Sequence, residues 1–339
     1  EGELGWFWRQ CVRLPLRFKI RKLVTSLIKA GERDGGIEAR PGLWRYCGWR
    51  DGKPHGWIAA PPPRLWPATY HQKFVVIDGE RAVLGGLDLD ERRWDDRRHR
   101  QRADQTWHDI SALVEGAAVA DVGRHFATLW NRELPRFRAV VAEWTDGLTK
   151  RLALEPLSDA APPPVRDQHI GDATVQIART WSCKSTSPWA KGPIPYVREL
   201  MAAHRAVILS ARRLLYVEAQ FFRSPEAAGW VMQALRDSPE LRVIILVANA
   251  PEEVAFEGQV DNPAHRHGEY LQTRALGRLI KVADGRLAVF SLAKQERVRT
   301  SEAQFEEQRG SAYGAGLIHI HSKLLIADDA ACLLSSANI

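Results

Sequence analysis

The chain has 339 residues, of which 45% are hydrophobic and 26% are charged, so it is long enough to bury one large core or two medium-sized ones. It contains no run of eighteen apolar residues, which argues against a transmembrane helix in the sequence given. Its net charge of +7 favours polyanionic partners, such as anionic lipid surfaces or nucleic acid. The four cysteines are scattered and form no zinc-type cluster with histidines, so neither a disulfide framework nor a structural metal site is indicated.

The two ends of the sequence look cut. It begins with Glu1 rather than Met and ends on "LLSSANI" in the middle of a pattern, so the lack of a signal peptide says nothing about export. The cysteine usage favours a reducing compartment. We therefore expect a bacterial-type chain with a missing N-terminus, located in the cytoplasm or at the membrane periphery, and monomeric.

The first elements predicted along the chain are a helix and a β-hairpin. Residues 6–30 mix apolar and basic residues at roughly helical spacing, with Pro15 as the expected break. A helix packed on the protein core is favoured there over a membrane-surface helix. Residues 40–70 are rich in Pro, Gly and Trp and predict a loop. Residues 70–89 predict a hairpin whose turn lies at residues 78–80.

Strands and helices then alternate. The charged segment 91–102 is interpreted as a solvated face rather than a phosphate contact, and residues 157–173, with three consecutive prolines, as a linker. The other predicted elements, in chain order, are a short strand and a helix ending near Leu134 within 106–134, strand 173–180, helix 194–207, strand 213–222, helix 227–238 and strand 241–250. Such alternation indicates an α/β or α+β layered fold.

One pattern occurs twice in the sequence. The spacing HxKxxxxD is formed first by His71, Lys73 and Asp78 and, 250 residues later, by His321, Lys323 and Asp328. In both copies small residues follow, 14 to 17 positions after the histidine: Gly85-Gly86-Leu87-Asp88 and Ser335-Ser336-Ala337-Asn338. One copy would be a weak signal, but two copies with matching tails are not expected by chance.

Strand geometry explains the spacing. Side chains alternate along a strand, so the histidine and lysine of each copy project from one face. Two such hairpins related by a pseudo-two-fold axis would gather two imidazoles and two ammonium groups around one tetrahedral phosphate. Gly86 and Ser336 would let the backbone approach the substrate, and Asn338 could donate a hydrogen bond to a phosphate oxygen. No metal or other cofactor is needed by such a site.

This arrangement suits phosphodiester cleavage in two steps. One neutral histidine would attack phosphorus, and the other, protonated, would give its proton to the leaving alkoxide and later activate water or an alcohol. The nucleophile needs an acceptor on its other ring nitrogen to fix the tautomer. Asp109 is the best nearby candidate to do this for His71.

With these motifs the sequence resembles the phospholipase D superfamily, and its phospholipase D branch more closely than its nucleases. "GGLDLDERRWD" resembles the GG-x-DL segment of that branch, and "WHDISALVEGAAVADVGRHFATLW" its WHD segment and following helix. "LLYVEAQFF" resembles its YIENQYF strand, with Ala219 in place of the usual Asn. The similarity covers roughly residues 65–339.

The resemblance implies roles for individual residues. His71 would be the nucleophile, His321 the general acid and base, and Asp109 the carboxylate that orients His71, while Asp78 and Asp328 would be structural. Gln220, with Glu218, would lie in the pocket. Three departures stand out: Ser335 replaces a usual Gly, the acidic residue expected to orient His321 would lie beyond Ile339, and the opening strand and helix of the family are not recognisable before residue 30.

The implied fold is α/β with two similar phospholipase D-like halves, each a mixed sheet flanked by helices, and one active site at their pseudo-two-fold junction. The halves would span residues 1–156 and 174–339. Two other histidine-containing segments are interpreted as structural: His319 as a spacer or supporting residue, and "HRHGE" at 265–269 as a solvated loop rather than a metal site.

The implied function is hydrolysis of glycerophospholipid headgroups at a membrane surface, giving phosphatidic acid, with transfer to an alcohol as a side activity. No nucleic-acid partner is expected. A cardiolipin-synthase-type phosphatidyltransferase is the nearest alternative, and a metal-independent nuclease is a more distant one. A phosphate- or lipid-binding module without turnover is the alternative from another class.

Overall fold

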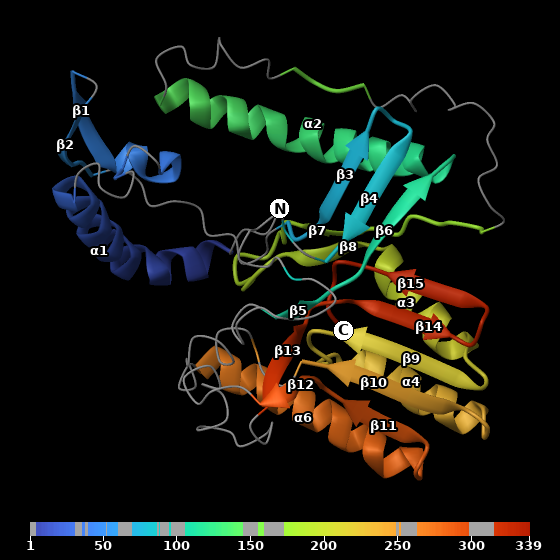
Figure 1. The fold of residues 1–339 in the computed structure, drawn as a ribbon. Helices are drawn as coiled ribbons and strands as arrows, with labels where there is room; N and C mark the ends of the chain where they lie inside the picture. Colours follow the sequence, from blue (N-terminus) through green and yellow to red (C-terminus); the bar gives the residue numbers. More distant parts are fainter. Residues whose placement is uncertain are drawn as a thin grey trace. The chain divides into compact units, whose positions relative to one another are not determined.

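The protein is a mixed α/β structure of several sheets flanked by helices (Figure 1), as the alternating pattern predicts. The computed structural model describes residues 5–30, 36–37, 40–51, 53–59, 70–86, 88, 95, 106–144, 155–158, 173–248, 251, 263–297 and 315–339. None of the helices in these ranges is long and apolar enough to cross a membrane.

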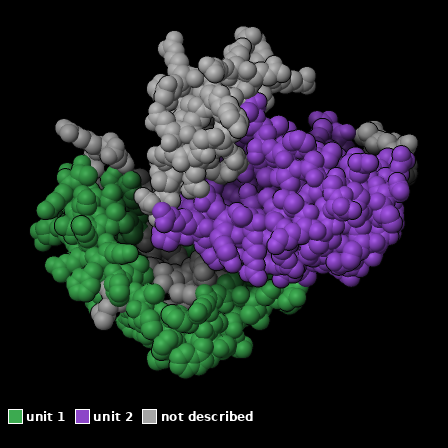
Figure 2. Space-filling model, turned by 90° about the horizontal axis from the view of Figure 1, so that it is seen from below, with its two compact units in different colours: residues 1–70, 123–161, 179–198 green, residues 71–122, 162–178, 199–339 purple. Residues whose placement is uncertain are grey.

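Contacts group the chain into two compact units, coloured in Figure 2. Unit 1 comprises residues 1–70, 123–161 and 179–198, and unit 2 comprises residues 71–122, 162–178 and 199–339. Both HxKxxxxD motifs therefore lie in unit 2. The predicted boundaries at residues 156 and 174 concern two similar halves rather than contact units, and they stay a prediction.

The described residues of unit 1 form helices and two antiparallel strand pairs. Its elements are α1 (Trp6–Ala30), the 3₁₀ helix η2 (Pro41–Tyr46), the antiparallel pair β1 (Cys47–Arg50) and β2 (Lys53–Trp57), most of α2 (Ala118–Trp144), and the antiparallel pair β7 (Thr180–Cys183) and β8 (Ile194–Arg198).

Two helices contain a proline and run further than predicted. α1 is continuous through Pro15, so the predicted break there is wrong. A proline inside a helix costs about 3 kcal/mol, but Ile20 and Val24 bury the following turns in a core with Tyr46 and Cys47.

α2 likewise passes Pro135 and ends at Trp144, not near Leu134. An ion pair between Glu133 and Arg136, 3.6 Å long, spans this proline. Two further predictions were wrong in extent: strand β7 begins only at Thr180, so 173–179 is not a strand, and the segment predicted as helix 194–207 begins with strand β8.

Among its described residues, unit 2 holds three sheets and the helices α3, α4 and α6. The sheets have the strand orders β3-β4-β6, β12-β13-β5 and β11-β10-β9-β14-β15. The bounds are β3 (Lys73–Ile77), β4 (Arg81–Gly85), β5 (Trp107–His108), β6 (Ser111–Glu115), α3 (Glu199–Ser210), β9 (Leu214–Ala219), α4 (Pro225–Asp237), β10 (Arg242–Val247), α6 (Pro263–Ala283), β11 (Leu287–Phe290), β12 (Leu292–Arg297), β13 (Ala315–Ile320), β14 (Leu324–Ala327) and β15 (Ala331–Leu334).

The largest core lies between the five-stranded sheet and helices α3, α4 and α6, which cover one of its faces (Figure 1). Alternate strand residues point into this core, and they include Leu215, Val217, Val243, Ile245 and Leu325. Tyr216 and Glu218 of β9 occupy the intervening positions. They therefore project from the opposite face of the sheet.

The two motifs form hairpins with the same register. Ile77 pairs with Arg81 in β3–β4, and the equivalent residues Ala327 and Ala331 pair in β14–β15. Each turn begins with an aspartate of positive φ, 53° at Asp78 and 52° at Asp328, a conformation that aspartate tolerates better than most residues. The predicted hairpin and turn of the first motif are confirmed, and the second motif repeats them.

The surroundings of the two hairpins differ. β14 is a central strand, with β9 on its other side, whereas β3 is an edge strand of its sheet. Leu325 is 1% exposed under the helices, while its equivalent in the first hairpin, Val75, is 48% exposed. The structure thus confirms the α/β class but not the predicted arrangement in two similar halves.

The turn of the second hairpin is fastened to the loop before β9. The Asp328 carboxylate accepts hydrogen bonds from the backbone N–H groups of Arg212, Arg213 and Leu214, at 2.8 to 2.9 Å. These bonds, that from Leu214 foremost, hold the pKa of Asp328 below its usual value. For Asp78 the structure gives no such bonds within the described residues.

This difference predicts unequal costs for the same substitution. Asp328→Ala should destabilise the protein by about 1–3 kcal/mol more than Asp78→Ala, because it leaves three backbone donors without their charged acceptor. Both variants lose an aspartate from the same positive-φ position, so the strain of alanine there cancels in the comparison. Urea unfolding of the two variants measures the difference, and equal midpoints would contradict the structural role of Asp328.

Candidate active site

A short parallel strand pair brings the segment around Asp109 next to the second motif. Trp107 and His108 of β5 pair with His319 and Ile320 of β13. The backbone N–H of His321 continues this ladder by donating to the carbonyl of His108, at 2.8 Å. Because the residues that follow both strands then lie side by side, this pairing carries Asp109 to the second motif.

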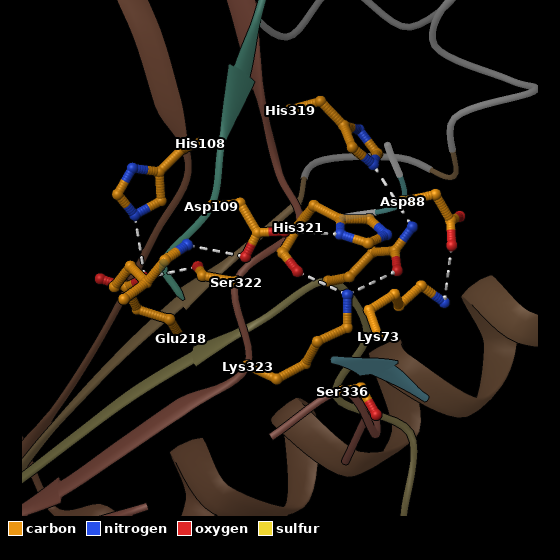
Figure 3. Close-up of polar contacts among 12 residues, drawn as sticks. Lys73, Asp88, His108, Asp109, Glu218, His319, His321, Ser322, Lys323 and Ser336 are labelled. Carbon is orange, nitrogen blue, oxygen red and sulfur yellow. Dashed lines mark hydrogen bonds and ion pairs between the residues drawn. The ribbon is translucent and has the colours of Figure 1, made fainter. Parts of the chain in front are cut away.

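The Asp109 carboxylate contacts the second histidine. Its Oδ2 lies 3.0 Å from Nδ1 of His321 (Figure 3), and the side chains are only 7% and 5% exposed. Nδ1 of His321 therefore donates to a carboxylate, and an imidazolium at this position is compensated by the adjacent negative charge.

This contact corrects two expectations. Asp109 was predicted to orient His71, and the carboxylate for His321 was predicted to lie beyond Ile339. The structure instead pairs Asp109 with His321. The error has a physical cause: nearness in sequence suggested His71, whereas the β5–β13 pairing joins residues more than 200 positions apart.

Gly86 makes room for Asp109. A Cβ at this position would lie 2.5 Å from Asp109 Oδ2 and 2.7 Å from Oδ1, closer than atoms can pack. Only glycine lets the chain leaving β4 pass the carboxylate at this distance. The structure therefore gives Gly86 a role in placing Asp109, while its predicted role in substrate binding stays a prediction.

The first histidine has a different acceptor. Nδ1 of exposed His71 lies 3.1 Å from the carbonyl oxygen of Ser336, in the tail of the second motif. A carbonyl only accepts, so Nδ1 carries the proton and Nε2 keeps its lone pair. Partial burial, and then the positive charges of Lys73 and Lys323, lower the pKa of His71 below its usual value. His71 is therefore neutral at pH 7, as a nucleophile must be.

The two lysines share one local geometry. Nζ of Lys73 donates to the carbonyl of His71 at 3.0 Å, and Nζ of Lys323 donates to the carbonyl of His321 at 2.5 Å. Each lysine also has a side-chain partner of its own. Lys73 lies 3.6 Å from the Asp88 carboxylate, whereas buried Lys323 donates to the Gln220 carbonyl at 3.2 Å. The two motifs therefore share a lysine–backbone contact as well as a hairpin.

Gln220 links several predicted residues. Its Oε1 accepts from Lys323 and also lies 3.4 Å from Nδ2 of Asn338. Its Nε2 lies 3.5 Å from Nε2 of His319, whose buried ring packs edge-on against Trp107. The structure places Gln220 and Asn338 beside the second motif, and contributions of these residues and of Ser336 to substrate binding stay predictions.

Sequence reasoning missed a buried network behind the second motif. Glu218, 4% exposed, accepts from His108 Nε2 at 2.9 Å, from the Tyr216 hydroxyl at 2.6 Å and from the Ser322 hydroxyl. Burial alone would raise the pKa of Glu218, but the bonds from His108, Ser322 and Tyr216 outweigh it and lower that pKa. The bond to Glu218 raises the pKa of His108. Two signals pointed to this network: His108 directly precedes Asp109, and Glu218 alternates with Gln220.

The segment 265–269 lies outside this site. It was predicted as a loop, but it forms part of helix α6, because the helix begins at Pro263. Among the residues that the structure describes, no group of three or more His, Cys, Asp or Glu side chains is placed to hold a metal ion.

Comparisons with known proteins agree with the motif pattern. Phospholipase D1 of Mus musculus is 29% identical over 257 residues, covering 69% of this chain and 22% of that protein. Phospholipase D1 of Saccharomyces cerevisiae is 23% identical, covering 98% of this chain and 24% of its own length. The chain thus spans about a fifth to a quarter of these relatives' length.

No family model matches the chain. Among solved structures, NucT from Helicobacter pylori covers 42% of this chain and 67% of that chain, with 18% identity and a TM-score of 0.25, too low to carry an argument. The comparison rests on the sequence relatives, of which the yeast protein matches nearly the whole chain, and on the hairpins that bear the two HxKxxxxD motifs. The chain is thus similar to phospholipases D across much of its length, which supports the resemblance of its motifs to the phospholipase D superfamily.

Proposed function

We propose that this protein is a phospholipase D-like phosphodiesterase that cleaves the headgroup from a glycerophospholipid and leaves phosphatidic acid. The observation that carries the proposal is the contrast between its two histidines. His71 has a neutral carbonyl acceptor and a lowered pKa, whereas His321 donates to the Asp109 carboxylate. The first arrangement favours a free base and the second a protonated ring, which are the two states that nucleophile and general acid require.

The first step forms a covalent intermediate. The Nε2 lone pair of His71 attacks phosphorus, and the bond from phosphorus to the headgroup oxygen breaks. His321 gives its Nε2 proton to the departing alkoxide, which leaves as an alcohol. Lys73 and Lys323 compensate the negative charge of the phosphoryl oxygens as the geometry changes.

The second step regenerates the enzyme. Neutral His321 now takes a proton from water, and the resulting hydroxide attacks phosphorus. The bond to His71 Nε2 breaks, the imidazole recovers its lone pair, and phosphatidic acid is released. An alcohol in place of water gives a phosphatidyl alcohol by the same route.

Replacing each histidine should remove a different role in the reaction. With phosphatidylcholine vesicles, ethanol and EDTA, His71→Ala should give neither phosphatidic acid nor phosphatidylethanol, because no phosphohistidine can form. His321→Ala should lower turnover by about 10² to 10⁴, the usual contribution of proton transfer. Separation of the lipid products and trapping of labelled phosphoprotein in an alkaline denaturing quench, which preserves the acid-labile phosphohistidine, measure both effects.

His55→Ala, at an exposed histidine of unit 1, is the matched control and should remain active. Lipid products from His71→Ala would overturn the assignment of the nucleophile. A folded parent that forms no phosphatidic acid but joins two phospholipids would favour the transferase. One that instead cuts plasmid DNA would favour the nuclease.

The lowered pKa of His71 predicts where activity is lost in acid. The reaction needs neutral His71, so kcat/KM should fall as pH drops through the pKa of the free enzyme's nucleophile. Because burial and the two lysines lower that pKa from 6.5, the midpoint of the acid limb should lie below pH 6.5. A pH profile of kcat/KM, with circular dichroism to confirm folding at each pH, tests this; a midpoint above 6.5 would contradict the assignment.

We also propose that an anionic phospholipid surface is the partner, and that α1 contacts it. α1 has seven basic and no acidic residues. Ile20 and Val24 face the core of unit 1, and the opposite side of the helix carries Phe18, 70% exposed, with the exposed residues Lys22 and Lys29. Phe7 and Trp8 are not free to insert, because both contact Trp189.

The surface of α1 can be tested against an equivalent one on α6. Phe18→Ser, Lys22→Glu and Lys29→Glu together should weaken partitioning onto phosphatidylglycerol-containing vesicles by about 30-fold or more, at about 1 kcal/mol for each basic residue. Ile280→Ser, Arg274→Glu and Lys281→Glu change α6 by the same charge at residues that are also exposed. Equal losses for both variants in a sedimentation assay would show that net charge, not α1, governs binding.

A further inference from the structure

The residue between the histidine and the lysine of the second motif has an unusual environment. Ser322 is fully buried, and its hydroxyl donates to Oε2 of Glu218. Glu218 lies on β9 opposite Leu324 of β14, so it belongs to the strand next to the motif. Residues 321–323 connect β13 to β14, and Ser322 bonds to Glu218 there while His321 and Lys323 bond to Asp109 and Gln220. The bond from Ser322 therefore restrains the backbone that carries His321 and Lys323.

We propose that Glu218 and His108 are positioning residues: through Ser322 they set the orientation of His321 and Lys323 toward the scissile phosphodiester. This inference rests on the proposed function, because it concerns the same site. It assigns to Glu218 and His108 a purpose beyond the stability of a buried ion pair.

The hydrogen bonds form a closed ring around the peptide between His321 and Ser322. The His108 carbonyl accepts the backbone N–H of His321 at 2.8 Å and that of Ser322 at 3.3 Å. The His108 side chain reaches Glu218 Oε2 at 2.9 Å, and the same oxygen accepts from Ser322 (Figure 3). A rotation of this peptide would break a bond on one side or the other, so the ring fixes it.

The fixed peptide determines where the His321 ring can go. Its Cα–Cβ bond direction follows from the backbone, and Nδ1 then meets Asp109 at 3.0 Å. Nε2 is left to deliver the proton to the leaving group. Misplacement of a catalytic group by about 1 Å can lower the rate by about 10²-fold. For a misplaced His321 the loss should be largest with substrates whose leaving group cannot depart without a proton.

Two hydroxyl deletions separate positioning from stability. Ser322→Ala removes the donor that belongs to the motif, and Tyr216→Phe removes a donor to the other oxygen of the same carboxylate, at 2.6 Å. Each variant removes one hydrogen bond that a neutral hydroxyl donates to the Glu218 carboxylate. A purely structural Glu218 would make the two variants alike.

The test compares two substrates that differ in their leaving group. Ser322→Ala should lower kcat on phosphatidylcholine by about tenfold or more, and lower it much less on phosphatidyl-p-nitrophenol, whose leaving group departs readily without a proton. Tyr216→Phe should stay within about twofold of the parent on both substrates. Glu218→Gln, which keeps an acceptor for Ser322 but loses the charge that pairs with His108, should show the same substrate dependence as Ser322→Ala.

Equal losses on both substrates, or equal losses in Ser322→Ala and Tyr216→Phe, would overturn the proposal. A parent that cleaves neither substrate would instead refute the proposed function. The positioning claim then has an independent readout: the ring ¹⁵N resonances of His321 should shift in Ser322→Ala and not in Tyr216→Phe. Unchanged resonances in both variants would overturn it as well.

Discussion

The candidate site depends on the pairing of β5 with β13. Three backbone hydrogen bonds extend this short ladder, from His319 to the Thr106 carbonyl and from His321 and Ser322 to the His108 carbonyl. Neighbouring residues on a strand point to opposite sides. His108 therefore meets Glu218 on one side, and Asp109 meets His321 on the other. One small region of pairing thus supplies both carboxylate contacts of the second motif.

The same pairing makes the two motifs unequal. Their hairpins share a register, a positive-φ aspartate and a lysine bonded to the carbonyl of its own histidine. Their histidines nevertheless differ, because His71 is exposed and bonded to a backbone carbonyl, whereas His321 is 4% exposed and bonded to a carboxylate. In the mechanism that we propose, these repeated residue types take opposite parts in the reaction, and the acceptor on Nδ1 distinguishes them.

Local sequence predicted what is local in the structure. The hairpins, their turns and the strand-helix-strand order from β9 to β10 follow from alternation and turn residues within a few positions. The lengths of α1 and α2 did not follow, because both helices continue through a proline, in α1 with packing around Ile20 and Val24 beyond it. The partner of Asp109 did not follow either, because it depends on a contact between strands that are distant in sequence.

Buried charge limits how this site can change. Glu218 with His108, and Asp109 with His321, place two carboxylates and two imidazoles in surroundings where an isolated charge is costly. Each carboxylate is compensated by its histidine, so removing the histidine leaves a buried carboxylate without that partner, which destabilises the fold. If His108 and Asp109 act as we propose, loss of either combines a catalytic effect with a folding effect. Ser322 is neutral, so removing its hydroxyl leaves both pairs intact while releasing the peptide that they surround. The effect of position on catalysis can therefore be measured at Ser322 without changing a charge.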